Sequence, residues 1–386
     1  MSSLDKFALD KLSALEAANR RRTLVDTARE DGIWVVREDR RLLSFSCNDY
    51  LNLTHHPKVK AAAIAAIEKY GTGAGASRLI TGNHPLLSEL ETRLAKLKGA
   101  EAACVFGSGY LANTGIIPTL IGEGDLLLLD ELSHSCLWAG AQMSRGTVFT
   151  FRHNDVGHAS DLLAQHRANH RHALIVTDGV FSMDGDIAPL HELSALAAEY
   201  DGWLMSDDAH GLGVIGEGRG SAFADGRKAN IDLQMGTLSK ALGSYGGYLC
   251  ASRAVIDLIK TRARTLVYST GLPPASVAAA IAALDVIEGD PDLAASAVEK
   301  ARGFTRALNL PLAQSPIVPI VLGEETSALE AQQVLERSGF LVTAIRPPTV
   351  PPGTARLRFA FTAGHPDNEI ARLAQIVRER VMPLRP

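Results

Sequence analysis

The sequence predicts an α/β protein in which a large, mainly parallel seven-stranded sheet is followed by a smaller α+β domain. Seven short apolar runs alternate with stretches of helical period up to about residue 287. Strands that are apolar on both faces are typical of parallel sheets covered by helices. The pattern breaks near residue 288, so we expect an N-terminal arm over residues 1–42, a large domain over 43–287 and a small α+β domain over 288–386.

The composition excludes several classes of protein. With 46% hydrophobic and 21% charged residues, the 386-residue chain is not expected to be disordered. Its 39 Lys and Arg against 43 Asp and Glu give a net charge of -4, without the basic surplus of a nucleic-acid binder. No apolar run approaches the roughly 18 residues of a membrane span. The four cysteines form no CxxC pair. We expect a soluble, cytoplasmic protein with neither nucleic acid nor membrane as a partner.

The elements of the arm and the large domain follow from local patterns. Spaced Leu and Ala residues among charges predict an amphipathic helix over residues 1–22, and IWVV at 33–36 predicts a short strand. The apolar runs predict strands at 102–106, 125–130, 147–151, 172–178, 202–207, 231–236 and 246–252. Helical periodicity between them predicts helices such as 84–99 and 189–202.

The small domain is predicted from a second set of elements. The segment 288–296, EGDPDLAAS, is typical of a hinge, and a long helix follows it. Apolar runs predict strands near 316–322 and 341–345. A Pro-rich loop, RPPTVPPG at 346–353, precedes the strand RLRFAF at 356–361 and a last helix.

Polar, glycine or ionisable residues follow five of the seven strands of the predicted large sheet. These residues are Gly107–Asn113, Ser133–Ser135, Asp178 with Ser182, Asp207–His210 and Thr237–Lys240. In open α/β sheets, ligands bind outside the carboxyl ends of the strands. We therefore expect these groups to form one shared polar site.

The residue types in this set point to a phosphorylated cofactor. The segment 107–113, GSGYLAN, joins a strand to a helix, where free backbone N–H groups and the helix dipole favour a phosphate. Thr237 and Ser239 add hydroxyl donors. Asp207, at a strand end, is a buried carboxylate that requires a cationic partner.

A lysine and a histidine complete this set. Lys240 lies in a loop of small residues, TLSKALGSYGG, where partial desolvation would lower its pKa toward a reactive neutral amine. His134 offers a flat ring. A phosphate cradle, a carboxylate for a pyridinium nitrogen, an imine-forming lysine and a stacking ring together predict a pyridoxal phosphate site.

Each of these residues alone has a structural explanation. GSGY is more often a tight turn, and DDAH at 207–210 a strand-end turn. A loop lysine is usually a solvated charge, and a histidine such as His134 usually has a backbone partner in the interior. Their common position at strand ends favours the cofactor interpretation.

Three other patterns are less persuasive. Gly211–Gly216 matches GxGxxG, but a turn-like segment follows in place of the helix that a dinucleotide site requires. His166, His170 and His172 lie in a basic segment without carboxylates, which favours a solvated surface over a metal site. No GxSxG motif supports a serine hydrolase.

Two arginines of the strand at 356–361 share one face. Arg356 and Arg358 alternate with Leu357, Phe359 and Phe361, so the two arginines lie on one face of the strand. That face is either exposed to solvent, in a half-buried strand, or directed into a binding site. We favour Arg358 as the arginine that binds a substrate carboxylate.

Six motifs carry a resemblance to a known family. They are SFSCNDYLNL, GAGASRLITG, SGYLAN, DDAHGLGVIGEGRG, GTLSKALGSYGG and RPPTVPPGTARLRFAFTAGH. Their order resembles the α-oxoamine synthases, which are fold-type I pyridoxal phosphate-dependent transferases, from about Arg20 to His365. The resemblance implies a decarboxylative condensation of an amino acid with an acyl thioester in a homodimer whose site lies between the subunits.

Within this family, the resemblance carried by the segment RPPTVPPGTARLR implies L-alanine and a pimeloyl thioester, bound to coenzyme A or an acyl carrier protein, as the substrates. The alternative within the family is a sister acyltransferase that uses glycine and another acyl-CoA. Two alternatives come from other classes of protein. One is an aminotransferase or lyase with the same cofactor, and the other is a non-catalytic cofactor-binding or regulatory protein.

The resemblance also implies residue roles. The catalytic residues would be Lys240, His134, Asp207 and His210. The cofactor would be held by Ser108, Gly109, Tyr110, His134, Ser182, Asp207, His210, Thr237 and Lys240, together with Thr270 from the partner subunit. The substrates would be bound by Arg22, Asn48, Ser77, His134, Thr349 and Arg358, where Arg22 is chosen from Arg20, Arg21 and Arg22.

Two departures from the family pattern concern individual residues. Leu87 stands where the family often has a histidine, and His84 is displaced from that place. The levulinate synthases tend to carry threonine at the position of Ser77. A smaller residue there is compatible with the extra methyl group of alanine.

Overall fold

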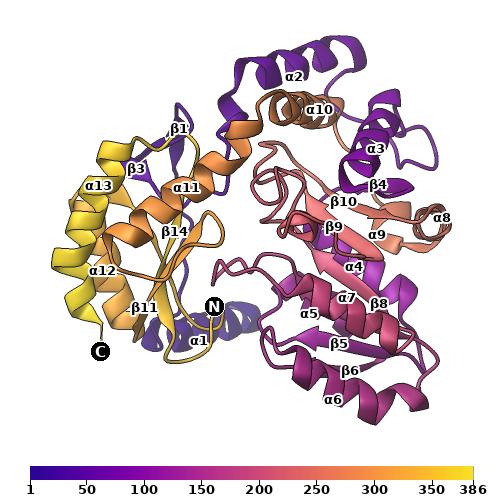
Figure 1. Cartoon of the computed structure of the whole chain (residues 1–386). Helices are drawn as coiled ribbons and strands as arrows, with labels where there is room; N and C mark the ends of the chain where they lie inside the picture. The colour runs from indigo at the N-terminus through magenta and orange to yellow at the C-terminus, as the bar shows by residue number, and fades with distance from the viewer. Residues whose placement is uncertain (386) are drawn as a thin grey trace.

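The computed structural model describes residues 1–385 and has two lobes (Figure 1). The larger lobe is built on a seven-stranded sheet of order β4-β10-β9-β8-β7-β5-β6. Its strands are β4 (Ala102–Phe106), β5 (Leu126–Asp130), β6 (Thr147–Phe151), β7 (Ala173–Asp178), β8 (Trp203–Asp207), β9 (Leu233–Thr237) and β10 (Gly247–Ala251). Strand β10 runs antiparallel to β4 and β9, and the other pairs are parallel. The prediction of a mainly parallel seven-stranded sheet is confirmed.

Helices lie on both faces of this sheet, and further helices pack on those. They are α2 (Pro57–Tyr70), α3 (Pro85–Lys98), α4 (Gly109–Leu120), α5 (Ser135–Met143), α6 (Val156–His166), α7 (Leu190–Glu199), α8 (Arg253–Arg262), α9 (Arg264–Val267) and α10 (Pro274–Gly289). Helix α3 shows how the sequence sets the boundaries, because Pro85 opens it and Gly99 ends it in the left-handed conformation. Leu87, Leu90 and Leu94 are buried at helical spacing.

The strand ends place several polar groups along one edge of the sheet. Strands β5, β7, β8 and β9 are mutually parallel, so their carboxyl ends face the same way. Asp130, Asp178, Asp207 and Thr237 are the last residues of these strands, and Asp178 pairs in register with Asp207. The sequence pattern therefore gathers its polar residues at one edge, as expected for a ligand site.

The smaller lobe combines the C-terminal part with the N-terminal strands (Figure 1). Its elements are α11 (Pro291–Ala307), β11 (Ile317–Gly323), α12 (Glu325–Arg337), β12 (Phe340–Leu341), β13 (Thr343–Ile345), β14 (Ala355–Ala360) and α13 (Asp367–Ile376). One sheet has the order β11-β14-β13. A second sheet joins β12 to β1 (Ala28–Glu30), β2 (Trp34–Arg37) and β3 (Arg40–Ser44). Phe45 packs with Phe340 and Phe361 in the core of this lobe.

The N-terminal helix is exposed, and the predicted hinge is a junction between two helices. Helix α1 (Ser3–Ala17) forms within the predicted range 1–22 but ends at Ala17. Ser2 and Asp5 form a capping box at its start, and none of its residues is buried. The predicted hinge at 288–296 contains the junction of α10 and α11, where only Asp290 separates the two helices. The division of the chain at residues 42 and 287 stays a prediction. None of the described helices has the length and apolar character needed to cross a membrane.

A buried ion pair beneath the site is expected to stabilise the larger lobe. Nζ of Lys98 lies 2.7 Å from Oδ2 of Asp208, and both side chains are almost fully buried. Breaking a buried pair leaves one charge without its partner, so Asp208→Asn should lower the free energy of unfolding by about 3–5 kcal/mol. Urea unfolding would measure the change. Asp225→Asn, at an exposed aspartate, is the control and should change the stability little.

Candidate functional site

A cavity of about 240 Å³ lies at the carboxyl edge of the large sheet, against β13 and β14 of the smaller lobe. Its lining residues are Ser46, Asn48, His134, Ser182, Met183, His210, Lys240, Thr343, Ile345 and Arg358. Six of the predicted site residues, Asn48, His134, Ser182, His210, Lys240 and Arg358, meet here although the sequence spreads them over more than 300 residues.

Lys240 supplies the amine of the cavity. It follows β9 in a turn in which Gly243 N–H donates to the Lys240 carbonyl at 2.9 Å. The side chain is half-buried, and desolvation lowers the pKa of its amine. The negative charge of Asp207 opposes this shift, and the positive charge of Arg358 adds to it. The amine is therefore more easily deprotonated than that of an exposed lysine.

Asp207 is a buried carboxylate with neutral partners. Nδ2 of Asn113 donates to its Oδ2 at 2.7 Å, and the backbone N–H of Ala209 donates to its Oδ1 at 3.0 Å. Among the described residues, no lysine, arginine or histidine forms an ion pair with it. A buried carboxylate without a cationic partner from the protein is suited to a cationic group of a ligand.

His134 caps helix α5 at the wall of the cavity. Its backbone N–H donates to Oδ2 of Asp178 at 2.9 Å, and its Nδ1 accepts from the N–H of Cys136 at 3.3 Å. Burial lowers the pKa of the His134 ring, and the charge of Lys240 acts in the same direction while that of Asp207 opposes it. These contacts fix the ring at the cavity wall.

His210 is a buried, neutral histidine. Its Nδ1 lies 2.6 Å from the hydroxyl of Tyr50. Burial holds the pKa of His210 well below its usual range, and the charges of Lys240 and Arg358 add to this effect. Burial also raises the pKa of Tyr50 to about 12, so the phenol keeps its proton. His210 and Tyr50 therefore form a neutral hydrogen-bonded pair.

The two arginines of β14 are both buried, so the alternative of a solvated basic face is wrong. Arg356 is 4% and Arg358 7% exposed, because the larger lobe covers this face of the strand. Arg358 donates to the Ser182 carbonyl at 2.5 Å and to Oδ1 of Asn48 at 3.1 Å, and it lines the cavity. Arg356 pairs with Asp184 at 2.5 Å outside the cavity.

The start of α4 offers backbone donors beside Thr237. Ser108 caps the helix by accepting from Leu111 N–H at 3.1 Å. The N–H groups of Gly109 and Tyr110 lie in the first turn, where no carbonyl of the same helix reaches them. A side chain added at Gly109 would place its Cβ 3.8 Å from Oγ1 of Thr237. The predicted phosphate-binding residues Ser108, Gly109 and Thr237 are therefore neighbours.

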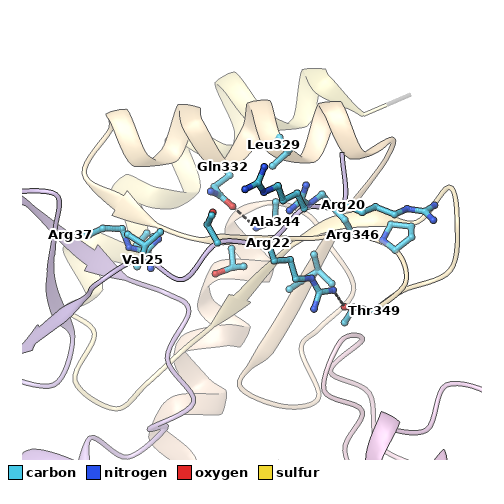
Figure 2. Close-up of a pocket in the computed structure, with 15 residues that line it drawn as sticks. Arg20, Arg22, Val25, Arg37, Leu329, Gln332, Ala344, Arg346 and Thr349 are labelled. Atoms are coloured by element: carbon cyan, nitrogen blue, oxygen red, sulfur yellow. Dashed lines mark hydrogen bonds between the residues drawn. The ribbon is translucent and has the colours of Figure 1, made fainter. Parts of the chain in front are cut away.

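A second cavity, of about 520 Å³, adjoins the first. Figure 2 shows the residues that line this second cavity. Thr343 and Ile345 of β13 line both cavities. Five arginines line the second one: Arg20, Arg21, Arg22, Arg37 and Arg346. Figure 2 shows Arg22 directed at Thr349, to whose hydroxyl it donates at 2.7 Å. The chain therefore provides a basic cavity beside the one that holds Lys240.

Comparison with known proteins places this geometry in a family. Residues 40–377 match the family described as aminotransferase class I and II. The chain belongs to the aminotransferase class I and II family. It is 65% identical over 377 residues to a protein of Beijerinckia indica named 8-amino-7-oxononanoate synthase, with 98% of each chain covered. The resemblance to the α-oxoamine synthases is therefore confirmed, and the chain groups with the 8-amino-7-oxononanoate synthases.

Two solved structures of this family are similar in fold. Serine palmitoyltransferase of S. paucimobilis, with a bound PLP–myriocin aldimine, has a TM-score of 0.92 and 28% identity, and covers 100% of this chain and 99% of its own. The 8-amino-7-oxononanoate synthase of Francisella tularensis has a TM-score of 0.76 and 26% identity, and the match covers 89% of this chain and 98% of that chain. The predicted fold-type I architecture is confirmed.

Three predicted site residues, Ser77, Tyr110 and Thr270, are not among those that line the cavity of Lys240. Ser77 and Thr270 form an isolated backbone bridge with each other. Thr270 is exposed, as is Tyr268 beside it, which is 79% exposed. Tyr110 is also 54% exposed. His84 contacts the Leu272 carbonyl, so it too lies outside the cavity.

Sequence reasoning assigned no role to three residues of the site. Tyr50 contacts His210, and Asn113 and Cys136 lie beside Asp207, with Cys136 Sγ 3.0 Å from Asn113 Nδ2. Asn113 lies within the glycine-containing segment that was singled out, but one turn into the helix. Its place on the buried face of α4, one turn after the predicted phosphate-binding residues, was the available signal.

Proposed function

We propose that this chain is a pyridoxal phosphate-dependent 8-amino-7-oxononanoate synthase. It condenses L-alanine with a pimeloyl thioester and releases CO2, the free thiol and 8-amino-7-oxononanoate. The observation that carries the proposal is a half-buried amine at Lys240 that lies within the electrostatic range of Asp207, a buried carboxylate without an ion-pair partner among the described residues. The 65% identical relative supports this particular reaction.

The residues of the site fit the cofactor. The amine of Lys240 suits an aldehyde, the carboxylate of Asp207 suits a pyridinium nitrogen, and the first turn of α4 with Thr237 suits a phosphate. When bound, pyridoxal phosphate supplies an electron-withdrawing ring that stabilises negative charge on the Cα of an amino acid. His134 and His210 would flank that ring, and Asp207 would keep its nitrogen protonated.

The side chains around this ring have separate tasks. Lys240 would hold the cofactor and move the proton of the amino-acid Cα, because its lowered pKa makes a neutral amine available. Arg358, preset by Asn48 and the Ser182 carbonyl, would bind the carboxylate of alanine. In the overall reaction, a bond forms between Cα and the thioester carbonyl carbon. The bonds from that carbon to sulfur and from Cα to the carboxylate break.

The acyl substrate would enter from the arginine-lined cavity. Arg20 and Arg21 each pair with a carboxylate, of Glu325 at 3.9 Å and Glu16 at 3.0 Å, whereas Arg22 donates to the hydroxyl of Thr349. This difference supports Arg22 and Thr349 as the contacts of the acyl substrate. A basic cavity suits the anionic groups that coenzyme A and the acyl carrier prosthetic group have in common.

Mass spectrometry of the products tests the proposed reaction. The holoenzyme is incubated with L-alanine and pimeloyl-CoA, and the expected product is 8-amino-7-oxononanoate with release of CO2 and coenzyme A. Glycine with short acyl-CoA substrates forms the matched arm. Turnover only with glycine would favour the sister acyltransferase, and amino-group transfer without loss of CO2 would favour an aminotransferase.

Removing the Arg22 side chain is expected to weaken binding of the acyl substrate. A lost hydrogen bond to a charged group costs about 1.5 kcal/mol or more, so Arg22→Ala should raise KM for the pimeloyl thioester about tenfold. KM for alanine should change little, because Arg358 lies in the other cavity. Arg145→Ala, at an exposed arginine, is the control. An equal rise of both KM values would contradict this assignment.

The rate of cofactor loading should depend on pH through Lys240. The reactive neutral amine increases as pH rises through its pKa, which burial lowers. The charge of Arg358 lowers this pKa further, so Arg358→Gln should raise it and move the midpoint of the loading rate to higher pH. Stopped-flow absorbance of apoprotein mixed with pyridoxal phosphate measures the midpoint. An unchanged midpoint would show that Arg358 does not act on this amine.

We further propose a homodimer in which Thr270 contacts the cofactor phosphate in the partner's site. Thr270 and the nearby Tyr268 are exposed in the single chain, which supports a surface that the partner subunit covers in the dimer. Mixing Lys240→Ala and Thr270→Ala protomers should recover activity, because one site of the mixed dimer carries neither substitution.

A cytoplasmic location is also proposed, and the four free cysteines support it. The division of the chain at residues 42 and 287 is retained as a proposal.

A further inference from the structure

The loop of residues 179–187 carries Ser182 into the cavity that holds Lys240. Its two ends are joined by a bridge between Val180 and Ile187, and the N–H of Phe181 donates to the Asp186 carbonyl at 3.0 Å. On the side of the smaller lobe, Arg358 contacts the Ser182 carbonyl. The position of Ser182 therefore depends on how the rest of this loop is held.

His153 holds the opposite side of the loop. Its Nε2 lies 2.8 Å from Oδ2 of Asp186, and its Nδ1 lies 3.1 Å from Oδ1 of Asp130, the last residue of β5. The ring also packs edge-on against Phe181, with the centroids 4.3 Å apart. Asn154 adds a bond to the same oxygen of Asp186 at 2.8 Å. His153 thus links the loop directly to a strand of the central sheet.

The chemistry of the two contacts requires a charged ring. Both nitrogens of His153 face carboxylate oxygens, and only the imidazolium form donates from both. Although burial opposes the charge, the bonds to Asp130 and Asp186 raise the pKa of His153 to about 10. The positive charge of His153 also acts to lower the pKa of Asp178 in β7, against the effect of burial. Glu131 accepts a hydrogen bond from the backbone N–H of His153 at 2.9 Å. The ring is therefore positively charged at neutral pH.

We propose that His153 is a positioning residue, which bridges Asp130 and Asp186 and thereby fixes loop 179–187 so that Ser182 meets the cofactor ring. The inference rests on the proposed function, because it needs a cofactor in the cavity. His153 itself does not line the cavity, and it acts only through the loop. Displacement of a reacting group by about 1 Å can cost up to about a hundredfold in rate.

A double-mutant cycle with Ser182 tests whether His153 acts through this residue. His153→Gln, Ser182→Ala and the double variant are compared with the parent protein, all reconstituted with pyridoxal phosphate and without acyl substrate. Two quantities are measured: the dissociation constant of the cofactor, and the pH midpoint of the absorbance change of the bound cofactor. Because neither measurement uses turnover, the result does not depend on whether the proposed condensation occurs.

We expect His153→Gln to weaken cofactor binding about tenfold and to shift the absorbance midpoint in the same direction as Ser182→Ala. In the double variant, His153→Gln should add little further change, because residues that act through one contact are not additive. Asp186→Asn should reproduce the shift with a smaller amplitude, and it serves as the second variant if His153→Gln does not fold. His55→Gln, at an exposed histidine, is the matched control.

Two results would overturn the proposal. One is an absorbance midpoint that neither His153→Gln nor Asp186→Asn moves. The other is a full, additive effect of His153→Gln in the Ser182→Ala background, which would show that His153 stabilises the fold without acting on the cofactor. If the variants lower the melting temperature of the apoprotein but leave the absorbance midpoint of the bound cofactor unchanged, that outcome also contradicts the proposal.

Discussion

Lys240→Ala is expected to lower the catalytic activity by at least about 10³-fold, because a group that transfers a proton in the transition state typically contributes about 10²- to 10⁴-fold. The same substitution removes the amine that would hold the cofactor, so no lysine-bound absorbance should remain after dialysis. The cavity contains no second lysine among its lining residues that could replace this amine. Borohydride reduction followed by peptide mass spectrometry should locate the trapped cofactor on Lys240 in the parent protein.

Lys228→Ala is the matched control for this experiment. Burial also lowers the pKa of Lys228, but this residue contacts the Gly99 carbonyl in another part of the lobe. If a lowered pKa were sufficient for attachment, reduction would label both lysines. An active Lys240→Ala variant that keeps its yellow colour would remove Lys240 from both of its roles.

The second large effect is expected for Asp207→Asn. The amide keeps the shape and the acceptor for Ala209 N–H, but it has no charge to keep the ring nitrogen of the cofactor protonated. Removal of one partner from a buried charge pair costs about 3–5 kcal/mol, which corresponds to about 10²- to 10⁴-fold in kcat/KM. Steady-state kinetics with alanine and pimeloyl-CoA would measure the loss.

Asp208→Asn separates this effect from a loss of stability. Asp208 is as buried as Asp207, but its partner is Lys98 and not a ligand. We expect Asp208→Asn to destabilise the protein while the folded fraction stays active. Asp207→Asn keeps only one of the two acceptor oxygens, and we expect it to lose more activity than its loss of stability explains. Similar activity losses in the two variants, per folded molecule, would argue against a special role of Asp207.

The sequence predicted those parts of the site whose signal is local. Asp207 ends β8, and Ser108 and Lys240 lie two and three residues after the ends of β4 and β9. The carboxyl ends of parallel strands meet at one edge of a sheet. The same reasoning did not find Tyr50, which lies before the first strand of the large sheet and reaches His210 only after folding. It also did not find His153, because nothing near it in the sequence marks the two carboxylates that it joins.

The burial of Arg356 and Arg358 illustrates the same limit. Alternation along β14 correctly placed both on one face, because side-chain direction in a strand has a period of two. What covers that face depends on the other lobe, whose Asp184 and Ser182 carbonyl bind the two arginines. Solvent exposure was therefore not readable from the strand itself.

By itself, the sequence determined the order of the strands and helices, the polar edge of the large sheet and the residues that end its strands. These follow from periodicity and turn chemistry, which act over a few neighbouring residues. Only the tertiary structure decided the partners of each charge: neutral donors for Asp207, the loop carbonyl for Arg358 and two carboxylates for His153. The physical reason is that pKa values and ion pairs depend on distance and burial, and folding sets both between residues far apart in the chain.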